Sequence, residues 1–217
     1  MKAVVFDMDG ILFDTEIVCM KAWMAVAGKN GLPDMDKIFP KCIGLNSNDS
    51  RRIVMAAYGE DFDYPHFRQE AADWFQAYLK ENGLPVKPGA PELLDWLQGT
   101  GCRVGLASST RSTSVFGHLE RSGFGKYFKA VITGDMVEHS KPRPDIYLLA
   151  CRELGVDPEE AYAIEDSPNG IRAAHAAGMR PVMVPDMIAP DDEMRELSFL
   201  IRTDLFEVLD YLRKEGL

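Results

Sequence analysis

The segment Ala3-Val4-Val5-Phe6-Asp7-Met8-Asp9-Gly10 is the most informative part of this 217-residue chain. Its first four residues are a continuous apolar run, which is typical of a strand buried on both faces of a parallel sheet. Asp7 and Asp9 are two positions apart, so in extended chain their side chains point to the same face. Gly10 then allows the backbone to turn sharply. The segment therefore predicts a buried strand with two carboxylates at its carboxyl end.

Further apolar runs of strand length follow along the chain. They cover residues 104–107, 130–132, 162–164 and 181–184, with a weaker one at 199–201. Helical patterns lie between them, at residues 91–97, 115–119, 144–154 and 169–177, and three of these stop near a glycine. Strands that alternate with helices of this length indicate right-handed βαβ units and a parallel sheet, an α/β fold.

One long segment breaks this alternation. Between residues 15 and 83 the pattern is helical, most clearly at residues 17–26, 50–58 and 67–79, and no strand is indicated. The Gly83-Leu84-Pro85 and Pro88-Gly89 sequences then mark the return to alternating elements. We therefore predict a catalytic core of residues 1–14 and 84–217 with a small helical cap of residues 15–83 inserted after the first strand.

Polar residues gather where the predicted strands end, which is where ligands bind in open α/β sheets. These residues are Asp7 and Asp9 after the first strand, Ser108 and Ser109 after the second, Lys141 beyond the third, and Glu165 and Asp166 after the fourth. Taken singly, each has an ordinary interpretation as a helix cap or a solvated loop residue. Together they predict a single site at one edge of the sheet.

The charges of this predicted site indicate a metal ion and a phosphate. Two carboxylates as close as Asp7 and Asp9 resist joint ionisation unless a cation lies between them. Oxygen ligands from two strand ends suit Mg²⁺, which keeps water ligands and takes a substrate phosphate. Ser108 offers a hydroxyl beside backbone N–H groups, and Lys141 offers a positive charge, both of which suit a phosphoryl group.

The four motifs in this order resemble those of the haloacid dehalogenase superfamily of phosphohydrolases. The resemblance covers nearly the whole chain and rests on Asp7-Met8-Asp9-Gly10, Ser108, Lys141-Pro142 and Glu165-Asp166-Ser167. Asp14-Thr15-Glu16 and Pro144-Asp145-Ile146-Tyr147 are similar to the flanking sequences of the β-phosphoglucomutase-like phosphatases within it. The resemblance implies a Rossmann-like core with a helical cap, in agreement with the pattern of strands and helices. It also implies a cap that closes over the site, so the chain crossings at residues 13–16 and 86–91 are the predicted hinges.

The resemblance also implies a role for each motif residue. Asp7 would attack phosphorus, form an aspartyl-phosphate and bind Mg²⁺. Asp9 would protonate the leaving oxygen, then deprotonate water, and bind the metal through its backbone carbonyl. The expected phosphate-binding residues are Ser108, Ser109, Lys141 and Thr15. Asp166, together with Glu165 directly or through water, would complete the metal ligands.

Three other functions are weighed against this one. A dehalogenase would need no metal and would lack Asp9. A phosphomutase of the β-phosphoglucomutase type would carry a histidine where this chain has Cys19, and an arginine soon after a cap glycine. Here Gly44 is followed by Leu45, Asn46, Ser47 and Asn48, and the nearest arginines are Arg51 and Arg52. A binding module without catalysis would be expected to lack a motif residue, and none is missing. Hydrolysis of small phosphomonoesters, phosphorylated carbohydrates first among them, is the favoured function.

The composition of the chain limits the kinds of partner and environment that we expect for it. The formal net charge of −10 disfavours nucleic acid and anionic membranes, both of which repel an acidic protein. No uncharged run reaches membrane-spanning length, and the four cysteines form no metal-binding pattern, so we expect buried free thiols in a cytoplasmic protein. The sequence does not specify an oligomeric state. Trp23, Trp74 and Phe75 are expected in the cap core, or alternatively against a substrate.

Overall fold

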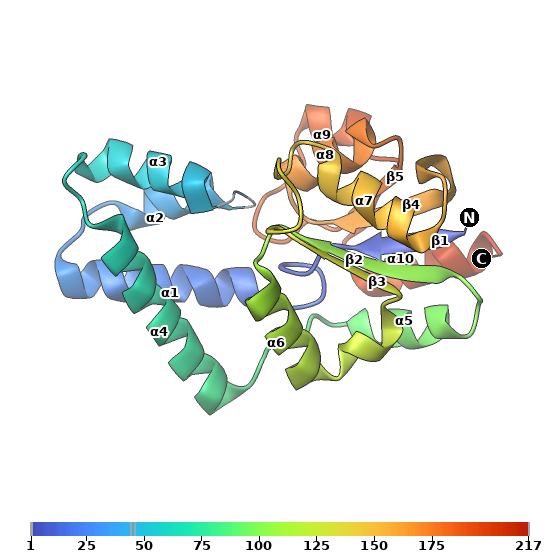
Figure 1. Ribbon diagram of the computed structural model, residues 1–217, viewed down its shortest axis with the longest axis horizontal. Coiled ribbons are helices and arrows are strands. Elements are labelled where there is room, and N and C mark those ends of the chain that lie inside the picture. Colours follow the sequence, from blue (N-terminus) through green and yellow to red (C-terminus); the bar gives the residue numbers. More distant parts are fainter. Residues whose placement is uncertain (1, 44, 46, 217) are drawn as a thin grey trace.

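The computed structural model describes residues 2–43, 45 and 47–216 and is built around a six-stranded parallel sheet (Figure 1). The strand order is β3-β2-β1-β4-β5-β6, with β1 between β2 and β4. The strands are β1 (Ala3–Phe6), β2 (Arg103–Ser108), β3 (Ala130–Thr133), β4 (Ala161–Glu165), β5 (Arg180–Met183) and β6 (Leu200–Ile201). The predicted α/β class is confirmed, and each predicted strand is present within one or two residues.

Alternate residues of the central strand point into two separate cores. Val4 and Phe6 pack with α5 (Ala90–Gln98), α6 (Ser112–Ser122) and α10 (Leu205–Lys214) on one face of the sheet. Ala3 and Val5 pack with α7 (Asp145–Leu154) and α8 (Pro168–Ala176) on the other face, where α9 (Asp192–Leu197) also lies (Figure 1). Because both faces are covered, the strands are apolar throughout rather than alternating.

Two helices near the C-terminus were not predicted. α9 begins after Asp191 and α10 after Asp204, and both aspartates cap their helix by accepting a backbone N–H bond, from Met194 and Glu207 respectively. The buried residues of α10 are spaced as an amphipathic helix requires, at Leu205, Val208, Leu209 and Leu212. The signal for α10 is therefore present in the sequence. Short 3₁₀ turns complete the structure at η1 (Phe39–Cys42), η2 (Phe124–Tyr127) and η3 (Pro158–Glu160).

The residues between β1 and α5 form a group of helices at one end of the sheet, seen at the left of Figure 1. They are α1 (Thr15–Asn30), α2 (Met35–Ile38), α3 (Ser47–Tyr58) and α4 (Tyr64–Asn82). They enclose a hydrophobic cluster of their own, in which the ring of Trp23 packs edge-on against Phe39 and Phe67 at centroid distances of 5.3 and 5.2 Å. A small helical cap inserted after the first strand is thus confirmed.

The two chain segments that join the cap to the core run side by side. The Asp14 N–H donates to the Pro85 carbonyl and the Lys87 N–H donates to the Leu12 carbonyl, each at 2.9 Å. Lys87 also forms an ion pair of 2.7 Å with Asp186, in the loop after β5. Because both crossings are held in one short ladder, we propose that the cap moves about this pair, near the predicted hinges.

Two further expectations concern the surface and the thiols. No helix in the described part of the chain is long and apolar enough to cross a membrane. All four cysteines are free, but only Cys42 and Cys151 are buried. Cys19 and Cys102 are half-buried, so the expectation of four buried thiols is wrong for these two, which lie beside the cavity and at the start of β2 respectively.

Candidate active site

The chain turns immediately after β1, and Gly10 makes that turn possible. Gly10 has a φ of +81°, and a Cβ atom there would lie 2.4 Å from Oδ2 of Asp166. Its N–H donates to the Phe13 carbonyl at 2.8 Å, which closes a tight loop. Only glycine fits both the conformation and the space. The loop places the acidic end of β1 directly against the end of β4.

Lys141 joins three elements of the core. It is 3% exposed, and its Nζ atom donates to Oδ1 of Asp7 at 2.5 Å, to Oε1 of Glu165 at 2.5 Å and to the Ala107 carbonyl at 3.0 Å. Burial lowers the pKa of Lys141, but the charges of Asp7 and Glu165 raise it by more, so the net shift is upward. The structure thus brings Lys141, which follows β3 at some distance, onto the ends of β1 and β4.

The nucleophile predicted from the sequence is buried with little solvent contact. Burial raises the pKa of Asp7 to about 8; Lys141 lowers it, while Glu165 and Asp9 raise it further. Burial also raises the pKa of Asp166 far above its usual range, and the charges of Glu165 and Asp7 add to that effect. Several buried carboxylates thus share one lysine, so a further cation is needed to keep them all ionised.

The donors around this group fit a divalent metal ion. Asp7, Glu165 and Asp166 each offer a carboxylate oxygen, and these oxygens lie within 4.8 Å of one another. The Asp166 side chain accepts no hydrogen bond within the described residues, which leaves it available as a ligand. Hard oxygen ligands in small number are what Mg²⁺ prefers. Three of the four predicted metal ligands therefore lie together, and their chemistry suits the predicted ion, whereas a role for the backbone carbonyl of Asp9 stays a prediction.

Glu165 differs from the other two carboxylates because hydrogen bonds occupy both of its oxygens. Oε1 accepts from Lys141 Nζ and from the Tyr147 hydroxyl, the latter at 2.8 Å. Oε2 accepts from the Asp166 N–H, the Ser167 N–H and the Ser167 hydroxyl at 3.1 to 3.2 Å. A Cβ atom at Gly170 would lie 1.9 Å from this carboxylate. Glu165 therefore anchors Lys141 and the loop after β4.

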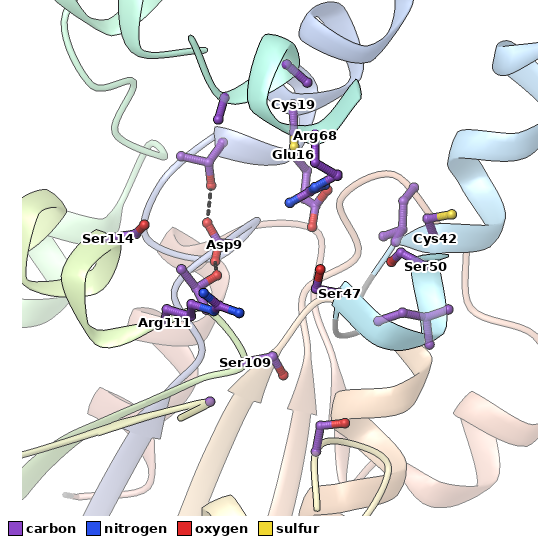
Figure 2. Close-up of a pocket in the computed structure, with 18 of the residues that line it drawn as sticks. Asp9, Glu16, Cys19, Cys42, Ser47, Ser50, Arg68, Ser109, Arg111 and Ser114 are labelled. Atoms are coloured by element: carbon purple, nitrogen blue, oxygen red, sulfur yellow. Dashed lines mark hydrogen bonds between the residues drawn. The ribbon is translucent and has the colours of Figure 1, made fainter. Parts of the chain in front are cut away.

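Asp9 is held from two sides by threonine hydroxyls. Thr15 donates to Oδ1 at 2.6 Å, and Thr110 donates to Oδ2 at 2.8 Å. Dashed lines at Asp9 in Figure 2 mark hydrogen bonds among the residues drawn. Ser108 is 1% exposed and accepts the Thr110 N–H at 3.1 Å, while Ser109 lines the cavity. Phosphate binding by Ser108, Ser109, Lys141 and Thr15 stays a prediction.

A cavity of ≈ 770 Å³ opens over these residues and extends to the cap. The core contributes Asp7, Asp9, Lys141 and Asp166 to its wall, and the cap contributes residues of α1, η1, α3 and α4. Trp23 and Phe75 line it, and Trp23 also lies in the cap core, whereas Trp74 stacks on Tyr78 at 5.6 Å. Trp23 lies in the cap core and Trp74 and Phe75 pack against it, as expected, while contact of these rings with a substrate stays a prediction.

Several residues of the site were given no role in it from the sequence, although Glu16 and Tyr147 stand in the flanking sequences that carry the resemblance. Thr110 and Tyr147 hold Asp9 and Glu165, and Glu16 and Arg68 line the cap side of the cavity. Thr110 directly follows the two predicted serines, so its position at a strand end was a usable signal. Arg68 carries no local signal, because a lone arginine on a helix is usually solvated.

The structure describes some of the positions at which this chain differs from the phosphomutase type. Cys19 lines the cavity, at the position where the mutase type carries histidine. Arg51 and Arg52 are exposed: Arg51 contacts the Met55 sulfur and Arg52 pairs with Asp49. Neither arginine lines the cavity. Gly44 and Asn46 lie outside the described residues.

The parallel sheet with acidic strand ends, the buried lysine between them and the helical cap above define the class, a hydrolase with a Rossmann-like core and an inserted cap. The sequence model of the family described as haloacid dehalogenase-like hydrolase matches residues 4–184, and the chain belongs to that family. The resemblance that the four motifs indicated is thereby confirmed.

Named relatives within the family include both phosphatases and a mutase. The chain is 34% identical to the phosphorylated carbohydrates phosphatase of Thermotoga maritima over 186 residues, which cover 84% of each chain. It is 29% identical to the beta-phosphoglucomutase of Bacillus subtilis, over 98% of this chain and 97% of that protein. Its fold matches the crystal structure of CbbY from Rhodobacter sphaeroides in complex with phosphate, with a TM-score of 0.80, 26% identity and 96% of each chain covered.

Proposed function

We propose that this protein is a Mg²⁺-dependent phosphatase that hydrolyses small phosphomonoesters, phosphorylated carbohydrates among them, through an aspartyl-phosphate on Asp7. The observation that carries the proposal is the position of Lys141, whose Nζ atom lies 2.5 Å from Asp7 at the base of a cavity of ≈ 770 Å³. The similarity to a phosphatase named for phosphorylated carbohydrates supports the substrate class.

The reaction proceeds in two displacements. A carboxylate oxygen of Asp7 attacks phosphorus and the bond to the ester oxygen breaks, while Asp9 gives its proton to the leaving alcohol. Asp9 then takes a proton from water, whose oxygen attacks phosphorus and releases phosphate and the Asp7 carboxylate. Splitting one difficult displacement into two in this way is the usual gain of covalent catalysis. Thr15 and Thr110 keep Asp9 oriented for both proton transfers.

Asp7, Asp166 and the backbone carbonyl of Asp9 would hold Mg²⁺, which when bound supplies positive charge for the phosphoryl oxygens. Glu165 positions the residues around the metal rather than binding it directly, because its oxygens already accept hydrogen bonds from Lys141, Tyr147 and the loop after β4. Lys141 holds the phosphoryl group by its charge, and its own position is fixed by Asp7 and Glu165.

The proposal is tested by phosphate release from a panel of phosphomonoesters with Mg²⁺ and after its removal. We expect release that depends on magnesium. No release, with β-glucose 1-phosphate converted to glucose 6-phosphate instead, would make the protein a mutase and contradict the proposal. Cys19 and the exposed positions of Arg51 and Arg52 favour hydrolysis over that outcome.

A further inference from the structure

The cap side of the cavity carries one acidic side chain and one basic side chain. Glu16 of α1 and Arg68 of α4 both line the cavity, and Figure 2 shows their side chains together on its cap side. Burial raises the pKa of Glu16 to about 8, the charges of Asp9, Asp7 and Asp186 add to it, and Arg68 opposes them. The guanidinium of Arg68 is thus close enough to act electrostatically on the Glu16 carboxyl.

Neither of these side chains is engaged elsewhere in a way that explains its position. Within the described residues, no hydrogen bond or ion pair is formed by the Glu16 carboxyl or the Arg68 guanidinium. The guanidinium carbon lies 5.3 Å from the ring of Trp23, which is 2% exposed and packed in the cap core. Stacking on a fixed ring limits where Arg68 can point while leaving its N–H groups free to donate.

The rest of the cap wall is uncharged. Of the described cap residues that line the cavity, only Glu16 and Arg68 are charged. Their neighbours there include polar side chains, at Ser47, Ser50, Gln69, Gln76 and Cys19, and apolar ones, at Trp23, Phe39, Ile43, Leu45 and Phe75. The cap wall therefore offers one carboxyl, one guanidinium and several neutral polar groups, which can both donate and accept hydrogen bonds.

We propose that Glu16 and Arg68 determine specificity by binding the hydroxyl groups of an uncharged polyol tail on the phosphomonoester. The inference rests on the proposed function, because the core must first bind the phosphoryl group. Glu16 accepts hydrogen bonds from the hydroxyls of the tail and Arg68 donates hydrogen bonds to them. A purely alkyl tail would bury both charged groups without a partner, which is costly. More carboxyl groups than cationic side chains line the cavity, with Asp135 and Glu138 among them, so a second phosphate would be repelled and the tail is neutral.

The sharpest test compares two substrates of equal carbon number, sorbitol 6-phosphate and n-hexyl phosphate, which differ only in the hydroxyls of the tail. We expect kcat/KM for sorbitol 6-phosphate to exceed that for hexyl phosphate by about 10- to 100-fold in the wild type. Fructose 1,6-bisphosphate, with a second anionic group, should be a poorer substrate than sorbitol 6-phosphate. Equal turnover of the first pair, or a preference for the bisphosphate, would overturn the proposal.

The variants Arg68→Met and Glu16→Gln test whether these two residues cause the preference for sorbitol 6-phosphate. Each should reduce the sorbitol-to-hexyl ratio by about tenfold, mainly through KM for sorbitol 6-phosphate. Arg68→Lys keeps the positive charge but loses the forked N–H groups of the guanidinium, so its sorbitol-to-hexyl ratio should lie between those of the wild type and Arg68→Met. Arg52→Met and Glu60→Gln are matched controls, because both residues are exposed on the cap and neither lines the cavity. A ratio that Arg68→Met and Glu16→Gln leave unchanged would refute the proposal, even if both variants lose activity.

Failure of the proposed function is recognised separately. If the wild type hydrolyses no ester, the phosphatase assignment fails, but binding of the same two compounds can still be measured by calorimetry on the Asp7→Asn protein. Tighter binding of sorbitol 6-phosphate that Arg68→Met abolishes would support the subsite without turnover. Equal binding of both compounds would refute it. Circular dichroism and melting curves of each variant establish that the fold is intact.

Discussion

The hydroxyl of Thr15 donates a hydrogen bond of 2.6 Å to Oδ1 of Asp9. Thr15 is the first residue of α1, so the first helix of the cap directly contacts Asp9, the proposed acid/base residue after β1. Thr110 holds the other oxygen from the end of β2. The Ser108 hydroxyl also lies 3.5 Å from Oδ2. Asp9 is therefore oriented by cap and core together, and movement of the cap away from the core would release the hydroxyl that holds Oδ1.

Thr15→Val should lower kcat by about tenfold with a smaller effect on KM, because it removes one hydrogen bond that orients Asp9 while nearly preserving shape. Thr15→Ser keeps a hydroxyl and should retain most activity. Thr113→Val is the matched control, since Thr113 is exposed on α6. Steady-state kinetics with a sugar phosphate gives the measurement, and an unchanged kcat in Thr15→Val would show that this hydrogen bond is dispensable.

Asp7→Asn should reduce turnover by at least about 10³-fold, because an amide oxygen is a poor nucleophile and cannot form the aspartyl-phosphate. The fold should persist, since asparagine fills the same volume. Phosphate release and acid-quenched labelling from a radioactive phosphate donor give the two readouts, with Asp36→Asn, on the exposed surface of the cap, as the control. Appreciable residual turnover would remove Asp7 from the role of nucleophile.

Asp9→Ala should separate the two displacements. Nitrophenolate leaves without a proton, so p-nitrophenyl phosphate should still phosphorylate Asp7, whereas hydrolysis of the intermediate lacks its base. We expect a burst of about one nitrophenolate per enzyme followed by turnover about 10²- to 10⁴-fold slower than in the wild type, seen by rapid mixing. Steady turnover at the wild-type rate would dismiss the acid/base role of Asp9.

Removal of the metal should abolish turnover. The effect of the metal on stability should depend on pH. Burial raises the pKa of Asp7 to about 8 in the metal-free protein, from 3.8 in an unfolded chain. The folded state therefore holds this proton more tightly, and the stability that it contributes is present below pH 4 and is lost as pH rises through about 8. The Tm of the metal-free protein should fall between pH 5.5 and 8, less steeply in Asp7→Asn.

Mg²⁺ competes with that proton, so it should raise Tm more at pH 8 than at pH 5.5. Calorimetric melting with EDTA or with MgCl₂ at both pH values tests this, and activity should return when MgCl₂ is added in excess over EDTA. Indifference of both Tm and turnover to the metal would contradict the metal assignment. CaCl₂ is a useful comparison, because a larger ion can raise Tm without supporting turnover.

Tyr147→Phe should lower stability by about 1 kcal/mol and kcat by about tenfold. The hydroxyl of Tyr147 donates to Oε1 of Glu165 at 2.8 Å, and Glu165 in turn positions Lys141. Phenylalanine keeps the ring that Lys141 approaches at 5.0 Å, so the change isolates the hydroxyl. Denaturant melts and kinetics provide the readouts, with Tyr78→Phe on α4 as the control. If only stability changes, Tyr147 supports the fold alone.

The core strands and the acidic end of β1 could be predicted because their signals are local. A strand buried on both faces is an apolar run such as Ala3–Phe6, and two aspartates directly after it lie at the edge where ligands bind. α10 was missed although Leu205, Val208, Leu209 and Leu212 have helical spacing, so that error lay in the interpretation. The role of Glu165 could not be foreseen, because its hydrogen-bond partners come from two other segments.

The sequence by itself determined the α/β core, the helical insert and the chemical types at the strand ends, because periodicity and neighbouring residues are properties of short segments. The tertiary structure alone decided which groups meet. Thr110 reaches Asp9 across 101 positions of sequence, Lys141 lies between Asp7 and Glu165, and Arg68 comes to Glu16 through the packing of α4 on α1. Such contacts depend on how whole elements pack, and packing brings together residues whose local sequences carry no record of one another.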